Sequence, residues 1–425
     1  MHGTVFWGGS VHFGVGREGG NPLLMYVREE PKKTGRIILI AAIALVCAGV
    51  AVFYLNTTVM AKKPDYWPTT GWKTSSPEEQ GMDSAKLAAM FDALAGQNLH
   101  SMLIARNGYI VAEAYNSSTE QDQKQDVLSV TKSVTSTLMG IAIQQGKIGS
   151  VDEPAYSYFP ELAQDPDTRK QTILLKHLMT MTSGLSWSNE EEKSSKDMIN
   201  SPNWIEYITS QPMTGDPGTQ FAYSNGNAHL LSPILQKATG KNIFEYAKEV
   251  LFKPLGITDV SWDNDPQNQP NGAWGLQMTT RDMAKFGYLI LNNGKWEGNA
   301  VVPKDWVTKA TTGYVGENFK DGTMRGYGYL WWLRSKGNAV PADKKYEMYS
   351  ATGSGGQRIV VVPAQNLVLA FTADNSDSFF MDKLIDEYIV PSVLSSKALP
   401  ANEEASAKLQ DKIAQFKQTS DVPTE

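Results

Sequence analysis

The stretch that decides how this chain is assigned reads VLSVTKS and runs from Val127 to Ser133. Ser129 and Lys132 are three positions apart, so on a helix they share one face, with Cβ atoms about 5–6 Å apart. A hydroxyl is a weak nucleophile that needs an adjacent base, and a lysine becomes that base when burial lowers its pKa. The apolar run LMGIAI at 138–143 favours such burial. The spacing therefore predicts Ser129 as nucleophile and Lys132 as base, although Ser-x-x-Lys also arises by chance.

A second segment, PGTQFAYSNGN, covers residues 217–227. A Tyr-x-Asn sequence on a loop places a phenol and an amide close together, and the phenol of Tyr223 is able to carry the proton of a nucleophile to a leaving group. The alternative is an ordinary turn, because Pro-Gly and Asn-Gly favour turns and tyrosine is often a packing residue.

A third segment, YSATGSGGQRIVVVP, covers residues 349–363 and joins a glycine-rich stretch to a strand-like run. Glycines at the entry to a strand let a ligand approach the backbone closely. Backbone amides here would form half of an oxyanion hole, with the amide of Ser129 as the other half. A hairpin loop before a core strand is the alternative.

Strand patterns lie near both ends of the region that follows residue 67, and helical patterns lie between them. Asn107-Gly108 between two β-rich runs predicts a hairpin of 101–106 with 109–115. Further strands are expected over 328–333, 346–350, 358–362 and 367–372. Helices are expected over 85–94, 133–145, 172–181, 227–239, 280–291 and 376–394. This order predicts an α/β (α+β) fold with one antiparallel sheet built from both chain ends, flanking helices and an inserted, mostly helical lobe.

The N-terminal region carries an uncharged run, IILIAAIALVCAGVAVFYL, at residues 37–55. Its length approaches the roughly 20 residues that span a bilayer. More basic residues precede it than follow it, so the positive-inside rule places residues 1–36 in the cytoplasm. A signal peptide cleaved near Ala61, with secretion of the remainder, is the alternative. The expected location is the bacterial inner (cell) membrane, with a domain at 67–395 periplasmic or extracellular and a polar C-terminal tail or surface helix at 396–425.

Composition argues against several other classes of function. The net charge of −6 supplies no basic field to attract nucleic acid. One cysteine, Cys47, excludes an intrachain disulfide, and five histidines leave few ligands for a zinc site. No Gly-x-Ser-x-Gly elbow occurs, which disfavours an α/β-hydrolase triad. We therefore expect neither a metal nor a cofactor, and the oligomeric state stays unknown.

Some polar and aromatic residues between the main segments have simpler interpretations. His177 is interpreted as a packing or surface residue. The charged run NEEEKSSK at 189–196 is interpreted as a solvated loop that is able to border a cleft. Trp187 and Trp204 are interpreted as core residues, with cleft walls as the alternative.

The three segments, taken in this order, resemble the serine β-lactamase and penicillin-binding-protein superfamily, and most of all its class C-like and esterase branch. The stretches 74–81, 145–148, 178–185 and 278–283 also match, so the resemblance covers about residues 67–395. It implies that Ser129 is acylated, that Lys132 is the base and that Tyr223 relays the proton. It further implies that Asn225 orients the substrate, and that the oxyanion is bound by the Ser129 amide and by an amide of the Thr352-Gly353-Ser354 stretch, that of Ser354.

One departure from the pattern bears on the substrate. Ala351 stands where the superfamily usually has a lysine or histidine before Thr-Gly. That cation helps to hold a β-lactam carboxylate, so its absence weighs against efficient β-lactamase action unless Arg358 replaces it. The Gly-Gly-Gln at 355–357 is similar to the branch that includes 6-aminohexanoate-dimer hydrolase. The resemblance therefore implies small amide or ester substrates.

Two alternatives share the same nucleophile. A membrane-bound penicillin-binding or sensor protein would remain acylated, whereas a hydrolase would release its acyl group to water. A D-alanyl peptidase or β-lactamase would turn over cell-wall peptides or β-lactams, and Ala351 makes this less attractive. Turnover distinguishes a hydrolase from a sensor.

Overall fold

The computed structural model describes residues 64–315, 326–334, 346–375 and 380–421, and two short strands before them. The chain divides into two compact units, Met1–Val59 and Met60–Glu425. In the first unit, β1 (His12–Phe13) pairs antiparallel with β2 (Val27–Arg28). The expected membrane span or signal at 37–55 lies outside the described residues. Within the described ranges, no helix is long and apolar enough to cross a membrane.

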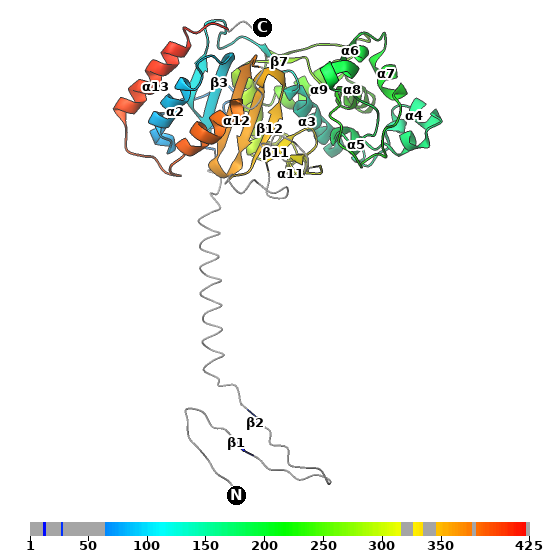
Figure 1. Cartoon of the computed structure of the whole chain (residues 1–425), viewed down its shortest axis with the longest axis horizontal. Helices are drawn as coiled ribbons and strands as arrows, with labels where there is room; N and C mark the ends of the chain where they lie inside the picture. The colour runs from blue at the N-terminus through cyan, green and yellow to red at the C-terminus, as the bar shows by residue number, and fades with distance from the viewer. Residues whose placement is uncertain are drawn as a thin grey trace. The chain divides into compact units, whose positions relative to one another are not determined.

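The second unit is organised around a seven-stranded antiparallel sheet with the order β10-β11-β12-β13-β14-β3-β4 (Figure 1). Its strands are β3 (Leu99–Arg106), β4 (Tyr109–Tyr115), β10 (Gly326–Tyr327), β11 (Trp332–Arg334), β12 (Met348–Thr352), β13 (Arg358–Val362) and β14 (Leu367–Ala373). β14 pairs with β3, for example Leu369 opposite Ile104, and so joins the late strands to the early hairpin. The predicted fold class is confirmed.

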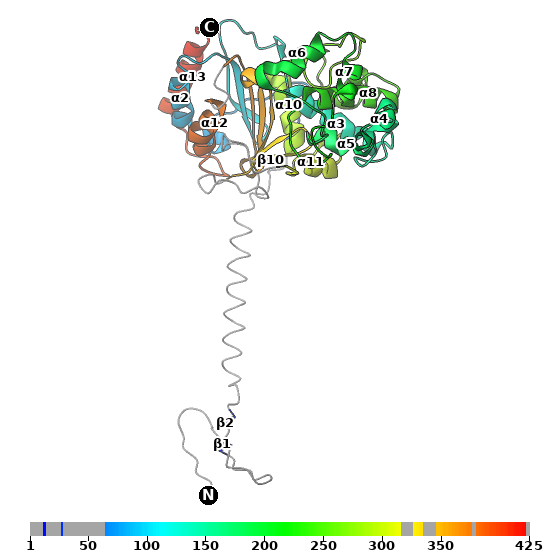
Figure 2. The same ribbon diagram turned by 45° about the vertical axis from the view of Figure 1, so that its right-hand side comes forward.

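Both faces of the sheet are apolar, because successive side chains of each strand point to opposite faces. Ile104 and Leu369 lie in the core on one face, while Ile359 and Val368 lie in the core on the other. The helices on the first face are α2 (Ser84–Asp92), α12 (Phe380–Leu384) and α13 (Glu403–Phe416). α10 (Thr280–Leu291) packs on the second face, and Figure 2 shows the sheet between these two helical layers.

A helical lobe is inserted between β4 and β10. Its helices are α3 (Val130–Gln144), α4 (Glu161–Gln164), α5 (Leu175–Met179), α6 (Lys193–Ile199), α7 (Trp204–Ser210), α8 (Asn225–Thr239), α9 (Ile243–Ala247) and α11 (Lys304–Ala310). Short strands also occur here, in the sheet β5 (Gln125–Asp126), β7 (Leu276–Met278), β6 (Ser261–Trp262) and in the pair β8 (Lys295–Trp296), β9 (Asn299–Ala300). α3 packs against α8 and α11 within the lobe and against β12 of the central sheet, so it connects the lobe to the rest of the unit.

The glycine in the middle of α3 permits one of these helix contacts. A Cβ atom on Gly140 would lie 2.1 Å from the indole ring of Trp306 in α11. Only a residue without a side chain therefore allows α3 to approach α11 this closely. The contact fixes the position of the helix whose first turn carries Ser129 and Lys132.

Several predicted elements match, and others differ for identifiable reasons. The strand at 358–362 and the helix at 280–291 are confirmed at the predicted bounds. The strand expected at 328–333 is instead two strands, β10 and β11, separated by a turn in which Leu330 has φ of 61°. The carbonyl oxygen of Leu330 accepts a hydrogen bond of 2.6 Å from Ser133, which holds this turn over α3.

The C-terminal segment packs more closely than its polar composition suggests. Leu409 and Phe416 of α13 are buried, and the ring centroid of Phe416 lies 6.0 Å from that of Phe91 in α2. Apolar residues on a single helical stripe are sufficient for this packing. The helix expected at 376–394 is shorter, because α12 continues as a π-helical turn, η9 (Ile385–Ile389), and then a 3-10 turn that contains Pro391.

Candidate active site

Ser129 and Lys132 lie at the start of α3, where the turn of helix brings them together as predicted. The Nζ atom of Lys132 is 2.8 Å from the Oγ atom of Ser129. Ser129 occupies the N-cap position of the helix and is partly exposed. Leu128, which precedes it, has φ of 46°, a left-handed conformation that is costly for a branched side chain. The turn at Leu128 thus leads directly into the helix whose N-cap is Ser129.

The ammonium group of Lys132 has two further neighbours. It lies 2.7 Å from Oδ1 of Asn225 and 2.9 Å from the carbonyl oxygen of Ala273. Both of these oxygens only accept hydrogen bonds. A neutral amine has two N–H donors and one lone pair. When Lys132 is neutral, the two N–H groups serve these acceptors, and the lone pair faces the hydroxyl of Ser129.

Burial favours that neutral form. The side chain of Lys132 is 1% exposed, and it forms no ion pair with any described carboxylate. Desolvation lowers the pKa of this amine well below its ordinary value, since taking a charge out of water is unfavourable without a compensating charge. The environment is therefore suited to a lysine that accepts a proton.

Tyr223 lies beside this pair. The Nζ atom of Lys132 is 5.0 Å from the centroid of the Tyr223 ring, and the ring stacks on Trp332 of β11 at 5.7 Å. Burial raises the pKa of the phenol to about 12, and its hydrogen bond with Ser129 opposes part of that rise. The phenol therefore keeps its proton at neutral pH and stands where it is able to exchange one with Ser129.

Asn225 is the first residue of α8, and its amide bridges two helices. Oδ1 faces Lys132, while Nδ2 donates a 2.9 Å hydrogen bond to Oγ of Ser195 in α6. Ser224 caps α8 by accepting from the amide of Asn227. This cap fixes the first turn of α8 and so places Asn225 against Lys132.

The third predicted segment meets the first at Gly353. A Cβ atom on Gly353 would lie 2.7 Å from the carbonyl oxygen of Val127, so the end of β12 touches the turn before Ser129. Ser354 follows as the exposed first residue of a 3-10 turn. In the described part of the chain, the backbone amides of Ser129 and Ser354 have no hydrogen-bond acceptor. Two unpartnered amides near the nucleophile are the donors that an oxyanion needs.

Thr352 and Arg358 lie opposite each other on neighbouring strands, so their side chains share one face of the sheet. Thr352 Oγ1 is 2.9 Å from Oγ of Ser350 on that face. Arg358 is buried there, 3.0 Å from a carboxylate oxygen of Asp382 in α12. Ala351 points to the other face. Arg358 consequently does not replace the cation that is absent at Ala351.

The three histidines of the described second unit have neighbours outside the site. Nδ1 of His177 accepts from the amide of Leu174, and burial lowers the pKa of this imidazole. His229 is fully buried, 3.1 Å from Asp265 and edge-on to Trp204, which confirms that Trp204 is a core residue. His100 lies 3.8 Å from Asp421. Among the described residues, no cluster of His, Cys, Asp or Glu is arranged to hold a metal ion.

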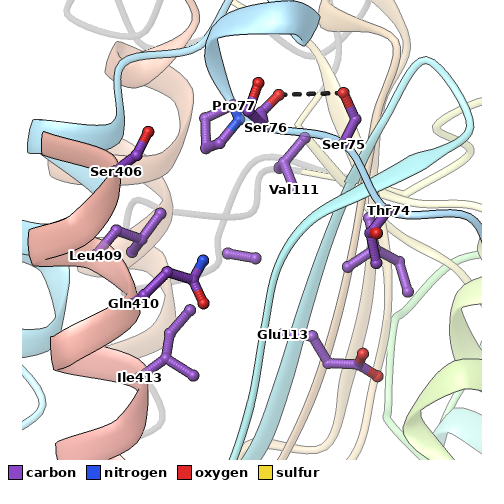
Figure 3. A pocket seen from close by; sticks show the side chains of 12 residues that line it. Thr74, Ser75, Ser76, Pro77, Val111, Glu113, Ser406, Leu409, Gln410 and Ile413 are labelled. Carbon is purple, nitrogen blue, oxygen red and sulfur yellow. Dashed lines mark hydrogen bonds between the residues drawn. The ribbon is translucent and has the colours of Figure 1, made fainter. Parts of the chain in front are cut away.

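Sequence reasoning missed Ser195 and Asn189. The charged composition of 189–196 predicts a solvated loop, but Ser194 and Ser195 are buried, and Asn189 donates a 2.7 Å hydrogen bond to the carbonyl oxygen of Tyr223. The signal that was available is the uncharged pair of serines inside a charged run. A separate pocket of about 450 Å³ lies between β4 and α13, and none of the predicted site residues lines it (Figure 3).

Comparisons with known proteins agree with this arrangement. A model of the Beta-lactamase family matches residues 87–390. The 6-aminohexanoate-dimer hydrolase of Paenarthrobacter ureafaciens is 24% identical over 298 residues, which cover 63% of this chain and 71% of that protein. A candidate 6-aminohexanoate-dimer hydrolase from Bacillus anthracis has a similar fold, with a TM-score of 0.63 and 20% identity over 80% of this chain and 90% of that one. A D-stereospecific amidohydrolase from Streptomyces has a TM-score of 0.57 and 18% identity over 73% and 99% of the two chains.

Proposed function

The chain belongs to the Beta-lactamase family and is a serine hydrolase of that superfamily, and from this premise we propose that it cleaves small amides or esters through an acyl-enzyme on Ser129. The observation that carries the proposal is the environment of Lys132. Its amine is desolvated, lies 2.8 Å from Oγ of Ser129, and has two other neighbours that only accept hydrogen bonds. This is the arrangement of a base that takes the proton of the serine.

Acylation proceeds as follows. The Ser129 proton moves to the lone pair of Lys132 while Oγ attacks the carbonyl carbon of the substrate, and the amides of Ser129 and Ser354 stabilise the resulting oxyanion. The bond to the leaving nitrogen or oxygen then breaks as Tyr223 donates its proton to that atom. Tyr223 regains a proton from Lys132, which restores the neutral amine.

Deacylation uses the same groups in reverse. Water attacks the acyl carbon and gives one proton to Tyr223 or Lys132, and the same proton is then returned to Oγ of Ser129 as the acyl–oxygen bond breaks. The products are a carboxylic acid and the free Ser129 hydroxyl. The proton transfers of acylation and deacylation are complete without a metal or cofactor.

The substrate class is proposed from the surroundings of the nucleophile. The position before Thr352 is an alanine, and Arg358 lies on the opposite face of the sheet, beside Asp382. A β-lactam carboxylate would therefore lack its usual cation. Two of the compared proteins are named a 6-aminohexanoate-dimer hydrolase and an amidohydrolase, which supports amides as the first substrates to test.

Intact mass spectrometry tests the proposal directly. The purified protein is mixed with a p-nitrophenyl ester and, separately, with a penicillin, and Ser129→Ala is the matched control. We expect a transient acyl adduct and steady release of nitrophenol that both disappear in Ser129→Ala. A stable penicillin adduct without turnover would instead support the sensor alternative, and steady β-lactam hydrolysis would support a β-lactamase.

A further inference from the structure

The segment 189–195 forms a hydrogen bond from each of its two ends to the Tyr223-x-Asn225 motif. Asn189 Nδ2 donates a 2.7 Å hydrogen bond to the carbonyl oxygen of Tyr223, and Ser195 Oγ accepts a 2.9 Å hydrogen bond from Nδ2 of Asn225. The first contact fixes the backbone of the tyrosine, and the second fixes the side chain of the asparagine. The segment 189–195 therefore restricts the positions of both Tyr223 and Asn225.

The shape of the segment depends on a tight reversal. Glu191 and Glu192 have φ of 45° and 56°, so two consecutive residues other than glycine adopt the left-handed conformation. This conformation is unfavourable for residues other than glycine and persists only where the surrounding contacts determine it. Asn189, just before the reversal, supplies one such contact, because its Nδ2 donates to the carbonyl oxygen of Tyr223 at 2.7 Å. The reversal turns Ser195, which is 6% exposed, toward Asn225.

An asparagine amide presents an acceptor at one end and a donor at the other. With Oδ1 toward Lys132, the amine uses an N–H group on Asn225 and keeps its lone pair for Ser129. If the amide turned over, Nδ2 would donate to that lone pair and compete with the Ser129 hydroxyl. The orientation of one side chain therefore decides whether the base is available.

We propose that Ser195 is a positioning residue that holds the Asn225 amide with Oδ1 toward Lys132. It acts by giving Nδ2 a buried acceptor on the side away from the base. The inference rests on the proposed function of Lys132 as the base. Ser195 itself touches neither Ser129 nor Lys132 in the described contacts, so its effect is transmitted through Asn225.

The test compares Ser195→Ala with Ser194→Ala. Both variants remove one hydrogen bond from a buried serine of α6, but only Ser195 contacts Asn225. For Ser195→Ala we expect kcat for a p-nitrophenyl ester to fall by about 2- to 13-fold, as the loss of one hydrogen bond predicts, with KM within about 2-fold. Ser195→Thr keeps a hydroxyl and should recover most of kcat.

The readout that a purely structural role would not move is the titration of Lys132. It is followed by NMR of protein labelled in its lysine side chains, with Lys132→Ala identifying the signal. In Ser195→Ala a donor faces the amine and favours its neutral form, so the titration should move to lower pH. Among the described residues, Tyr223 is the other titratable side chain in contact with this amine, and it is present in every variant.

The NMR titration does not depend on turnover. The proposed function and the positioning role of Ser195 are therefore tested by independent measurements. A wild type without Ser129 acylation would overturn the proposed function, while the Lys132 signal would still report on Ser195. An identical Lys132 titration in wild type and Ser195→Ala would overturn the positioning role. An equal shift in Ser194→Ala would do so as well, because it would assign the effect to the packing of α6.

Discussion

Gly353 approaches Val127 so closely that a Cβ atom on the glycine would lie 2.7 Å from the valine carbonyl oxygen. The same atom would lie 3.1 Å from Cβ of Leu128. Gly353 has φ of −116°, which any residue adopts, so the contact and not the backbone conformation requires glycine. Through this contact, the end of a strand of the central sheet sets the distance between Ser354 and the turn that carries Ser129.

Gly353→Ala should therefore impair catalysis by moving these two parts of the site away from each other. A displacement of about 1 Å costs up to roughly 10²-fold in rate, so we expect kcat to fall by about 10- to 100-fold. Gly215→Ala is the matched control, because the nearest atom to a Cβ there lies at 3.4 Å. Full activity in Gly353→Ala would show that the amides of Ser129 and Ser354 do not act together.

The pH dependence of hydrolysis should follow Lys132 on the acid side. Only the neutral amine accepts the proton, so kcat/KM rises as the pH passes through the Lys132 pKa. Burial lowers that pKa from its ordinary value, so activity appears at lower pH than a solvated lysine would allow. Burial raises the pKa of Tyr223 to about 12, so loss of its proton does not limit the rate near neutrality.

The rise of kcat/KM with pH is measured by a pH profile of ester hydrolysis, from which the rate of the Ser129→Ala variant is subtracted. Lys132→Arg is the companion variant, because its guanidinium remains charged and accepts no proton. We expect it to lose activity at every pH. If Lys132→Arg were active and its kcat/KM still rose with pH in the same way, the titrating group would be one other than Lys132.

Tyr223→Phe should affect substrates according to their leaving groups. An amine or alkoxide leaves only with a proton, and proton donation contributes about 10²- to 10⁴-fold. Nitrophenolate leaves without a proton, so the rate of p-nitrophenyl ester hydrolysis should fall by about 10-fold or less. Phenylalanine retains the stacking on Trp332, and the melting temperature should therefore change little. Equal losses for an anilide and a p-nitrophenyl ester would argue against Tyr223 as the donor to the leaving group.

Gly140→Ala should destabilise the protein although alanine is the better helix former. The new methyl group would lie 2.1 Å from the ring of Trp306. Overpacking of this kind costs about 1–3 kcal/mol, which exceeds the roughly 1 kcal/mol gained in helix propensity. Chemical denaturation measures the change in the free energy of unfolding. The double variant Gly140→Ala, Trp306→Ala should tolerate the methyl group better than the single variant if this contact is the cause.

The expectation of a retained anchor at 37–55 has its own test. Membrane and soluble fractions of cells that produce the full chain are separated, and the intact mass of the protein in each is measured. We expect the full-length mass in the membrane fraction. A mass that begins after Ala61 would instead show cleavage of a signal peptide.

The proximity of the proposed site residues was predictable, because each pair lies within a few positions of the sequence. Ser129 and Lys132 share a helical turn, Tyr223 and Asn225 lie two positions apart at the start of α8, and Asn107-Gly108 specifies the hairpin of β3 with β4. Hydrogen-bond geometry over three or four residues follows from backbone conformation alone. Runs rich in apolar and β-branched residues likewise predicted several strands of the sheet, among them β13 and β14.

Only the tertiary structure decided how those groups are tuned. The carbonyl oxygen of Ala273 reaches Lys132 across 141 residues of sequence, and Ser195 reaches Asn225 across 30. The face on which Arg358 lies depends on its strand pairing with Thr352. No local pattern encodes such contacts, because they arise when separate helices and strands pack and exclude water. The pKa of Lys132 is the clearest case, since desolvation is a property of everything that surrounds the amine.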